Sequence, residues 1–347
     1  MKSVDRVPEV VNPQALQRLA LLLRGVERVA IFCHARPDGD AIGSSVGLGN
    51  LLTLKGVEVM CIAPNKPPAH VAWCDSHGLV RSYEEEGAEV RAYLPTCELF
   101  FCLDFNDLSR LDEPLMLHVD PLSVPRVMID HHPYPTAQFD LYFSMPETSS
   151  TCELLTEVIL GYWGAEAITP EVAVPLYMGL MTDTGSFSYS CSRKRTFEIT
   201  GELISRGVDV PSVHSAVYNS RSLNSLMLQS YLLAHKTTFF ARNTCSIMCL
   251  DLDLQREYDY QPGDAEGIAN LPLTVDTVQI SVLLTERQNG TVRVSTRSTK
   301  RYAINSLMSR YFNGGGHPQA SGGTLRMPIS EAKRYTRQRL EEFLREA

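Results

Sequence analysis

The chain has 347 residues, of which 44% are hydrophobic and 21% charged, and its formal net charge is −8 at pH 7. This length predicts two domains that can each bury a core. The acidic balance argues against a protein that tracks long nucleic acid, because such proteins usually carry a basic excess. A phosphate-bearing ligand must therefore be held locally, and a bound cation can supply the missing positive charge.

The cysteines and the hydropathy pattern favour a cytoplasmic protein. There are nine cysteines, an odd number, and none belongs to a Cys-x-x-Cys pair. Several lie in apolar runs, among them Cys33 and Cys102, so we expect buried, reduced thiols. No apolar run is long enough to span a bilayer, and the N-terminus lacks the apolar segment of a signal peptide. We therefore expect no membrane partner.

In the first 200 residues, short apolar strands alternate with helices. Helices are expected over 13–25, 41–55 and 171–181, from the spacing of apolar residues and from Gly56 after the second. The expected strands are Arg28–Cys33, Glu58–Ala63, Leu99–Leu103 and Arg126–Ile129. Fully apolar strands between helices are typical of a parallel sheet with helices on both faces. The sequence therefore predicts an α/β fold here.

After about residue 200 the pattern changes to helices and hairpins. One hairpin is predicted over 238–251 and another across Asn289-Gly290, a dipeptide that favours tight turns. A helix over 306–311, a strand over 320–325 and a last helix from Ser330 complete the expected elements. We therefore predict a parallel-sheet domain over residues 1–200, a helical linker over 201–234, and a smaller α+β domain over 235–347.

Acidic and histidine side chains follow four of the apolar elements in the first half. They are His34-Ala-Arg-Pro-Asp38-Gly-Asp40, Asp104, Asp130-His131-His132 and Asp183. Taken singly, each has a plain interpretation as a turn or a helix cap. However, the carboxyl ends of parallel strands form the ligand crevice of such sheets, so we expect these segments to converge at one edge.

The convergent set is rich in metal-ligating groups: His34, Asp38, Asp40, Asp104, His131 and Asp183. Imidazole together with carboxylate suits Mn²⁺ better than Ca²⁺. These groups are too many for one catalytic ion with an open position, and they suit two ions roughly 3.5–4 Å apart. Such a pair lowers the pKa of a bridging water and binds a phosphoryl oxygen.

Two glycine-containing segments are candidates for phosphate contact. In Gly314-Gly315-Gly316-His317, three glycines leave backbone N–H groups unobstructed for a phosphate or ribose, and a flexible turn is the alternative. The neighbouring Arg297-Ser298 favours the clamp. In Gly43-Ser44-Ser45, small residues in the first turns of a helix permit either a phosphate at the helix N–H groups or tight packing.

These motifs, in this order, resemble the DHH/DHHA1 phosphoesterases, in particular the nanoRNase and 3′-phosphoadenosine 5′-phosphate phosphatase branch. The resemblance covers nearly the whole chain. The matching segments are His34-x-x-x-Asp38-x-Asp40-x-x-Gly43-Ser44, Asp130-His131-His132, Thr182-Asp183-Thr184-Gly185-Ser186-Phe187, Ser295-Thr-Arg297-Ser298 and Gly314-Gly315-Gly316-His317-x-x-Ala320-x-Gly322.

The resemblance implies a role for each residue of the set. One metal would be held by His34, Asp38 and Asp104, and the other by Asp40, Asp104, His131 and Asp183, with Asp104 as the bridge. His132 would face the substrate phosphate, and Asp130 would orient a ligand histidine. The implied nucleotide contacts of the second domain are Arg297, Ser298, Asn305, Gly315, Gly316 and His317. Mn²⁺ is the expected ion, with Mg²⁺ and Co²⁺ as alternatives.

The implied activity is hydrolysis of short oligoribonucleotides to mononucleotides, and of 3′-phosphoadenosine 5′-phosphate to AMP, by a chain that can form a homodimer. A catalytically silent nucleotide sensor is disfavoured by the complete ligand set. A pyrophosphatase- or exopolyphosphatase-like phosphohydrolase is also an alternative, although the family II pyrophosphatases lack the glycine–histidine motif. Asn313 and Thr296 depart from the family pattern. We expect the turn at Asn313 to survive, because Asn tolerates left-handed backbone, and both positions to bear on substrate preference.

Overall fold

The computed structural model describes residues 11–220, 222–261, 263–265 and 267–346. The chain forms two compact units, and the first ends at Ser220. The domain boundaries expected at residues 200 and 235 stay a prediction. Each unit is described by itself below.

A six-stranded, fully parallel sheet forms the middle of the first unit, in the order β3-β2-β1-β4-β5-β6. Its strands are β1 (Arg28–Phe32), β2 (Glu58–Ala63), β3 (Val80–Ser82), β4 (Leu99–Leu103), β5 (Arg126–Asp130) and β6 (Leu141–Ser144). The four predicted strands are confirmed. The other two are the short edge strands β3 and β6, which keep partly exposed side chains and so show no continuous apolar run.

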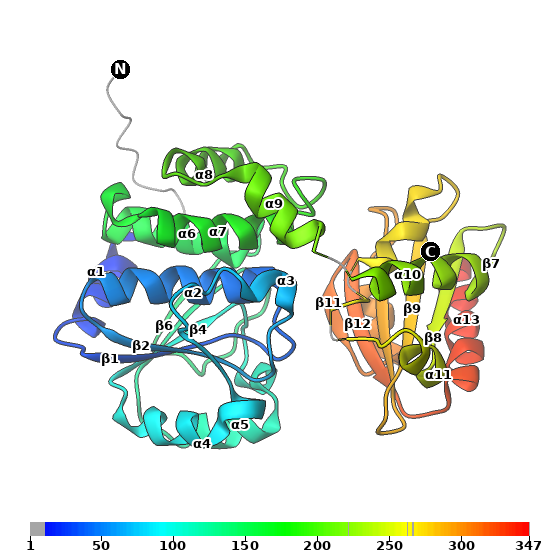
Figure 1. Ribbon diagram of the computed structural model, residues 1–347, viewed down its shortest axis with the longest axis horizontal. Coiled ribbons are helices and arrows are strands. Elements are labelled where there is room, and N and C mark those ends of the chain that lie inside the picture. Colours follow the sequence, from blue (N-terminus) through cyan, green and yellow to red (C-terminus); the bar gives the residue numbers. More distant parts are fainter. Residues whose placement is uncertain (1–10, 221, 262, 266, 347) are drawn as a thin grey trace. The chain divides into compact units, whose positions relative to one another are not determined.

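Helices cover both faces of this sheet (Figure 1), as the sequence predicted. On one face lies α2 (Gly39–Leu54), with α6 (Thr151–Tyr162) and α7 (Pro170–Asp183) stacked on it. The other face is covered by α4 (Tyr83–Tyr93) and α5 (Glu113–Val119). Because both faces are covered, β4 buries every residue. The remaining helices are α1 (Pro13–Leu22), α3 (Ala69–Ala72), α8 (Lys194–Ser205) and α9 (Val210–Tyr218).

Helices α2 and α7 approach so closely that only glycine fits where they meet. A Cβ on Gly43 would overlap the carbonyl oxygen of Pro175 in α7. The hydroxyls of Ser44 and Ser45 are buried and donate hydrogen bonds of 2.7 Å to backbone carbonyls of their own helix. Of the two interpretations of the Gly43-Ser44-Ser45 segment, helix packing is therefore the correct one.

The second unit contains a six-stranded mixed sheet in the order β11-β12-β10-β9-β8-β7. Only the β8–β9 pair is parallel among its paired strands. The strands are β7 (Thr237–Phe240), β8 (Cys245–Leu250), β9 (Ile280–Glu286), β10 (Val292–Ser298), β11 (Gly315–His317) and β12 (Ala320–Leu325). Helices α10 (Leu223–His235), α11 (Leu252–Glu257), α12 (Asn305–Tyr311) and α13 (Ile329–Glu346) complete the unit. Both predicted hairpins are confirmed.

The cysteine side chains lie mostly in the interior. All nine cysteines are free thiols, and seven are buried. Burial raises the pKa of the Cys102 thiol to about 12, so this side chain behaves as an inert apolar group. No helix in the described part of the chain is long and apolar enough to cross a bilayer.

Candidate metal centre and nucleotide site

The expected ligand segments meet where the order of the strands reverses. From β1 the chain moves outward to β2 and β3, and it then returns to β4 on the other side of β1. Loops at such a switch point diverge and leave a crevice at the carboxyl edge. His34 follows β1, Asp104 directly follows β4, and Asp130 is the last residue of β5. Three adjacent strands therefore deliver these side chains to one place.

Asp104, His34 and Asp38 form a first group of ligating atoms. Asp104 Oδ2 lies 3.3 Å from His34 Nε2, which lies 3.8 Å from Asp38 Oδ2. Asp38 is also the N-cap of α2, since its Oδ1 accepts hydrogen bonds from the N–H groups of Asp40 and Ala41. One carboxylate oxygen is thus used for the cap, and the other points to the group.

Asp104 belongs to a second group through its other oxygen. Its Oδ1 lies 3.6 Å from His131 Nε2. The same nitrogen lies 3.6 Å from Asp183 Oδ2 and 4.0 Å from Asp40 Oδ2. The ligating atoms of His34, Asp38 and Asp104 lie within 4.8 Å of one another, and so do those of Asp40, Asp104 and His131, which is close enough for one ion in each set. This is the arrangement that a bridging carboxylate requires.

The electrostatics of the two groups fit divalent cations. Burial, together with the charges of Asp40 and Asp38, raises the pKa of Asp104 well above its usual range. Burial raises the pKa of Asp183 to about 7. Burial lowers the pKa of His131, but the surrounding carboxylates outweigh it and raise the value to about 9. Carboxylates that repel one another in a buried place are stabilised by positive charge, and oxygen with imidazole nitrogen is a donor set for ions such as Mn²⁺.

The N-terminus of α6 is a part of the site that the sequence analysis missed. Asp40 accepts hydrogen bonds from the N–H groups of Thr151 (2.6 Å) and Cys152 (2.9 Å), and the Thr151 hydroxyl donates to Asp104 Oδ1 at 3.0 Å. These bonds orient both carboxylates, and the helix dipole stabilises their charge. A signal was present, because Ser150-Thr-Cys-Glu153 has the spacing of a capping box, and Ser150 does cap this helix.

Two buried glutamates of α6 fix this helix against α8. Glu153 is fully buried and accepts hydrogen bonds from the Ser149 N–H, the Thr196 hydroxyl and the Arg193 guanidinium. Glu157 is also fully buried and forms a two-pronged pair with Arg195, at 2.6 and 2.8 Å. Such pairs have a fixed geometry, so the N-terminus of α6 is held in place from behind.

Asp130 holds His132 and not His131. The Nδ1 atom of His132 lies 2.7 Å from Oδ1 of Asp130, which is completely buried. Burial raises the pKa of Asp130, but the hydrogen bonds from His132 and the positive charge of the two neighbouring histidines together outweigh it, and the pKa falls below its usual value. His131 Nδ1 instead lies 3.4 Å from the carbonyl oxygen of Thr148. The expectation that Asp130 orients a metal-binding histidine therefore needs correction: it orients the histidine assigned to the substrate.

Backbone strain in the first unit is concentrated around these residues. Seven non-glycine residues in its described part adopt left-handed φ values, and all lie in loops that follow β1, β4, β5 or α7: Arg36, Asp104, Asp112, Tyr134, Ser186, Phe187 and Ser190. This conformation costs about 1–2 kcal/mol per residue. Strain of this kind persists where surrounding contacts enforce it, which is common at functional sites.

In the second unit, Arg297 and His317 lie on one face of the sheet. Arg297 of β10 pairs with Ala320 of β12, and Ala320 pairs with His317 of β11. Directly opposed residues of antiparallel strands point to the same face. The arginine and the histidine therefore flank the small side chain of Ala320, as a surface for an anionic ligand requires. The Ser298 hydroxyl donates a hydrogen bond of 2.6 Å to Tyr302 O. The Asn305 side-chain oxygen accepts one of 3.0 Å from the Ser306 N–H.

The glycine run is a strand and not a flexible turn. A Cβ on Gly314 would overlap the carbonyl oxygen of Gly322, so a side chain there would separate the two strands. Strand β11 lies at the sheet edge, and alternate N–H groups of an edge strand point outward. Asn313 has φ +48°, which confirms that asparagine supports this turn. Thr296 is fully buried and donates to Ser321 O at 2.7 Å, so its side chain is not exposed on the sheet surface, and its bearing on substrate preference stays a prediction.

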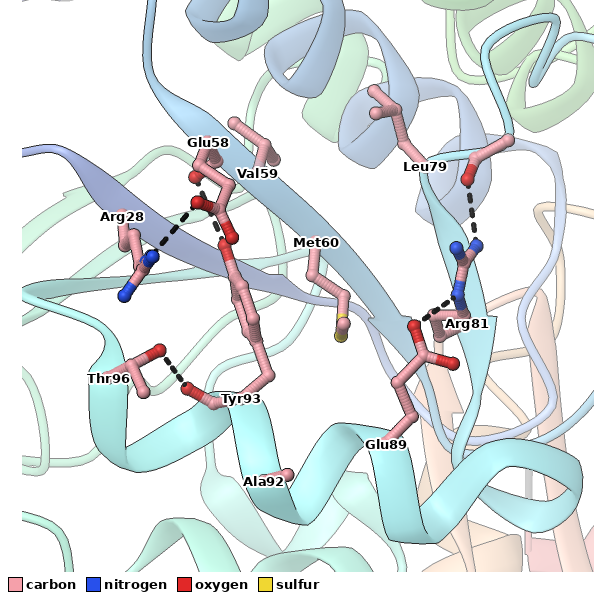
Figure 2. A pocket seen from close by; sticks show the side chains of 11 residues that line it. Arg28, Glu58, Val59, Met60, Leu79, Arg81, Glu89, Ala92, Tyr93 and Thr96 are labelled. Atoms are coloured by element: carbon pink, nitrogen blue, oxygen red, sulfur yellow. Dashed lines mark hydrogen bonds and ion pairs between the residues drawn. The ribbon is translucent and has the colours of Figure 1, made fainter.

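A surface groove of about 460 Å³ lies elsewhere on the first unit, between β2 and α4 (Figure 2). Arg28 pairs with Glu58 at 2.9 Å, and Arg81 pairs with Glu89 at 3.0 Å. Because both arginines are already neutralised, the groove offers little to a phosphate. Arg28 and Glu58 begin their strands, whereas the ligand set follows the strand ends. This groove is therefore not part of the candidate site.

Comparison with known proteins assigns both units to one family. A model of the DHH family, N-terminal domain, matches residues 28–180, and a DHHA1 domain model matches 245–346. A probable bifunctional oligoribonuclease and PAP phosphatase NrnA of Streptococcus mutans is 27% identical over 310 residues, 89% of this chain and 93% of that protein. The bifunctional oligoribonuclease and PAP phosphatase NrnA of Bacillus subtilis is 25% identical over 300 residues, 86% of this chain and 90% of that protein.

A solved structure agrees along almost the whole chain. It is that of an exopolyphosphatase-related protein from Bacteroides fragilis, with a TM-score of 0.91 and 32% identity over 96% of this chain and 98% of that one. The ligand segments described above lie within or just after the stretch matched by the first model. With both family models matched in succession and a relative this similar over its length, the chain belongs to the DHH/DHHA1 family.

Proposed function

We propose that this protein is a metal-dependent phosphoesterase that hydrolyses short oligoribonucleotides to mononucleotides and 3′-phosphoadenosine 5′-phosphate to AMP. The observation that carries the proposal is the position of the buried Asp104 between two groups of ligating atoms. The substrate class is supported by the two NrnA relatives, which are named oligoribonuclease and PAP phosphatase and align over most of their length.

The first unit would supply the metal ligands. His34, Asp38 and Asp104 would hold one divalent ion, and Asp40, Asp104, His131 and Asp183 the other, with Mn²⁺ favoured by the mixed donor set. Two such ions supply an activated water and neutralise the phosphoryl oxygens. The hydrogen bonds from α6 to Asp40 and Asp104 keep these carboxylates in place, so that little reorganisation accompanies binding.

His132 would act on the substrate directly. Its Nδ1 is committed to Asp130, so its Nε2 is the nitrogen that can donate a proton to the leaving oxygen or neutralise a phosphate. The buried Asp130 carboxylate accepts the Nδ1 hydrogen bond and fixes the orientation of the ring. His132, Asp130 and the bridging Asp104 are therefore the residues to which we assign catalysis.

The second unit would bind the nucleotide. Arg297, His317 and the edge strand Gly315–His317 offer a guanidinium, an imidazole and backbone N–H groups to phosphate and sugar. We place Ser298 and Asn305 next to them as supporting contacts. The net charge of −8 offers no extended track for further phosphates, so the site would select very short strands.

An assay panel tests the proposal. The Mn²⁺-loaded protein is given oligoribonucleotides from two residues upward, 3′-phosphoadenosine 5′-phosphate, pyrophosphate and polyphosphate. We expect mononucleotides from the shortest oligomers and phosphate from the bisphosphate. Faster hydrolysis of pyrophosphate or polyphosphate would support the phosphohydrolase alternative. Tight nucleotide binding without turnover would support the silent sensor.

A further inference from the structure

Tyr134 presents an aromatic ring to solvent in the loop that follows the Asp130-His131-His132 segment. It is 90% exposed, more than any other large hydrophobic or aromatic residue among those that the structure describes. It comes two residues after His132, in the loop between β5 and β6. An isolated exposed tyrosine needs no explanation on its own. Tyr134 differs from such a residue in the hydrogen bonds of its loop and in its backbone conformation.

Hydrogen bonds fix the loop on both sides of Tyr134. Before it, the carbonyl oxygen of Pro133 accepts a bond of 2.6 Å from the Asn106 side-chain amide. After it, both the N–H and the hydroxyl of Thr136 donate to the carbonyl oxygen of Asn106, at 3.0 and 3.1 Å. Asn106 is only two residues beyond Asp104. The loop is therefore pinned to the segment that carries the bridging ligand.

The backbone at Tyr134 is in an unfavourable conformation. Its φ is +64°, in the left-handed region, where a bulky residue is an outlier. A glycine or asparagine would adopt this conformation more readily. Here a large aromatic residue is strained by its backbone, gains no burial, and is held by the contacts of Asn106. An exposed aromatic ring that is kept in a strained backbone conformation, in a loop fixed by hydrogen bonds, is suited to bind a ligand from solvent.

We propose that Tyr134 is a stacking platform for a nucleobase of the substrate. The proposal rests on the proposed function and adds one substrate contact to it. In this contact, the first unit would bind the flat face of the base next to the phosphate being cleaved. Proteins that bind single-stranded RNA without sequence preference stack bases on aromatic rings, because every base has such a face. Because Tyr134 follows His132 by two residues, we assign to it the base of the reacting nucleotide.

A pair of dinucleotides isolates the base from the phosphate chemistry. One is an adenylyl dinucleotide, and the other has the same sugar–phosphate backbone but no bases. With Mn²⁺ bound, Tyr134→Ala should lower kcat/KM for the adenine substrate by about 5-fold to 100-fold, the range typical of one stacked base. It should leave the abasic substrate unchanged. Tyr134→Phe should keep the wild-type rate, because the ring and not the hydroxyl stacks.

The matched control is Tyr142→Ala, which removes another exposed tyrosine from the regular strand β6 and should change neither rate. Equal rates of Tyr134→Ala and the wild type on the adenine substrate would overturn the platform, as would equal losses on both substrates. If the wild type hydrolyses neither dinucleotide, the proposed function fails. Equilibrium binding of the two dinucleotides then tests the platform. Weaker binding of only the adenine dinucleotide by Tyr134→Ala supports it, and an affinity for that dinucleotide equal to the wild type's overturns it.

Discussion

Replacing either partner of the Asp130–His132 pair should separate catalysis from metal binding. In Asp130→Asn, an uncharged amide of nearly the same shape takes the place of a fully buried carboxylate that His132 contacts at 2.7 Å. The ring stays packed, but its hydrogen bond goes to a neutral acceptor in place of a charged one. His132→Ala removes the proton donor itself. In both variants the ligands around Asp104 remain.

The expected loss of kcat in each variant follows from the interaction that the substitution removes. A hydrogen bond to a charged group contributes about 1.5–3 kcal/mol, against about 0.5–1.5 kcal/mol for a neutral one. Neutralising Asp130 therefore costs about 1–2 kcal/mol, which corresponds to about 5- to 30-fold in kcat. Loss of a general acid costs about 10²- to 10⁴-fold, so His132→Ala should be the slower enzyme.

The assay combines turnover of a dinucleotide with the metal content of each purified variant. The double variant of Asp130 and His132 should be no slower than His132→Ala, because the carboxylate acts through the imidazole. By contrast, His131→Ala should lose metal. Glu58→Gln, the same change of charge in the exposed pair with Arg28, is the matched control.

Two results would refute this reasoning. Equal metal loss in the Asp130, His131 and His132 variants would mean that the three residues form one ligand set. Multiplicative losses in the double variant would mean that Asp130 does not act through His132.

Three further predictions concern the metals and the nucleotide. Asp104→Asn, which removes the shared ligand, should lower turnover by about 100-fold or more under saturating Mn²⁺, and near wild-type rates would contradict the bridge. Arg297→Ala should raise KM for dinucleotides about tenfold or more, from a lost contact of about 1.5–3 kcal/mol. It should leave hydrolysis of bis-p-nitrophenyl phosphate almost unchanged, and equal losses on both substrates would exclude the clamp. Because the pKa of Asp183 is raised to about 7, Mn²⁺ affinity by calorimetry should rise as pH passes 7. Metal-free protein should lose stability to urea as pH rises from about 4 to 7 and level off above, because in that window the folded state holds a proton that the unfolded state has released.

The central strands and the meeting point of the ligand segments could be predicted because each depends on local pattern. A strand such as Leu99–Leu103, buried on both faces, must be apolar throughout, and the next residue must then lie at the carboxyl edge. The sequence analysis placed Asp104 there without knowing its neighbours. The structure brings the six candidate ligands together, while their roles stay predictions.

The supporting contacts could not be predicted because their partners are distant in sequence. Asp40 could have capped its own helix, but Asp38 does so, and Asp40 instead accepts hydrogen bonds from residues 111 and 112 positions later. The partner of Asp130 was ambiguous for a related reason. Adjacent histidines point in different directions, and only the loop geometry after β5 decides which one returns to the carboxylate.

The close glycine packing of α2 against α7 sets the distance between two of the candidate metal ligands. Asp40 lies in the first turn of α2, and Asp183 is the last residue of α7. A methyl group on Gly179 would overlap the sulfur of Cys152 and press on the backbone of α2. Gly179→Ala would therefore widen the gap between Asp40 and Asp183, since the new methyl group would lie 3.1 Å from the Cα of Asp40 and clash with Cys152. Mg²⁺ demands near-ideal octahedral geometry, so a wider ligand spacing should change which divalent ions the enzyme binds before it unfolds the domain. The spacing of α2 and α7 thereby determines metal preference.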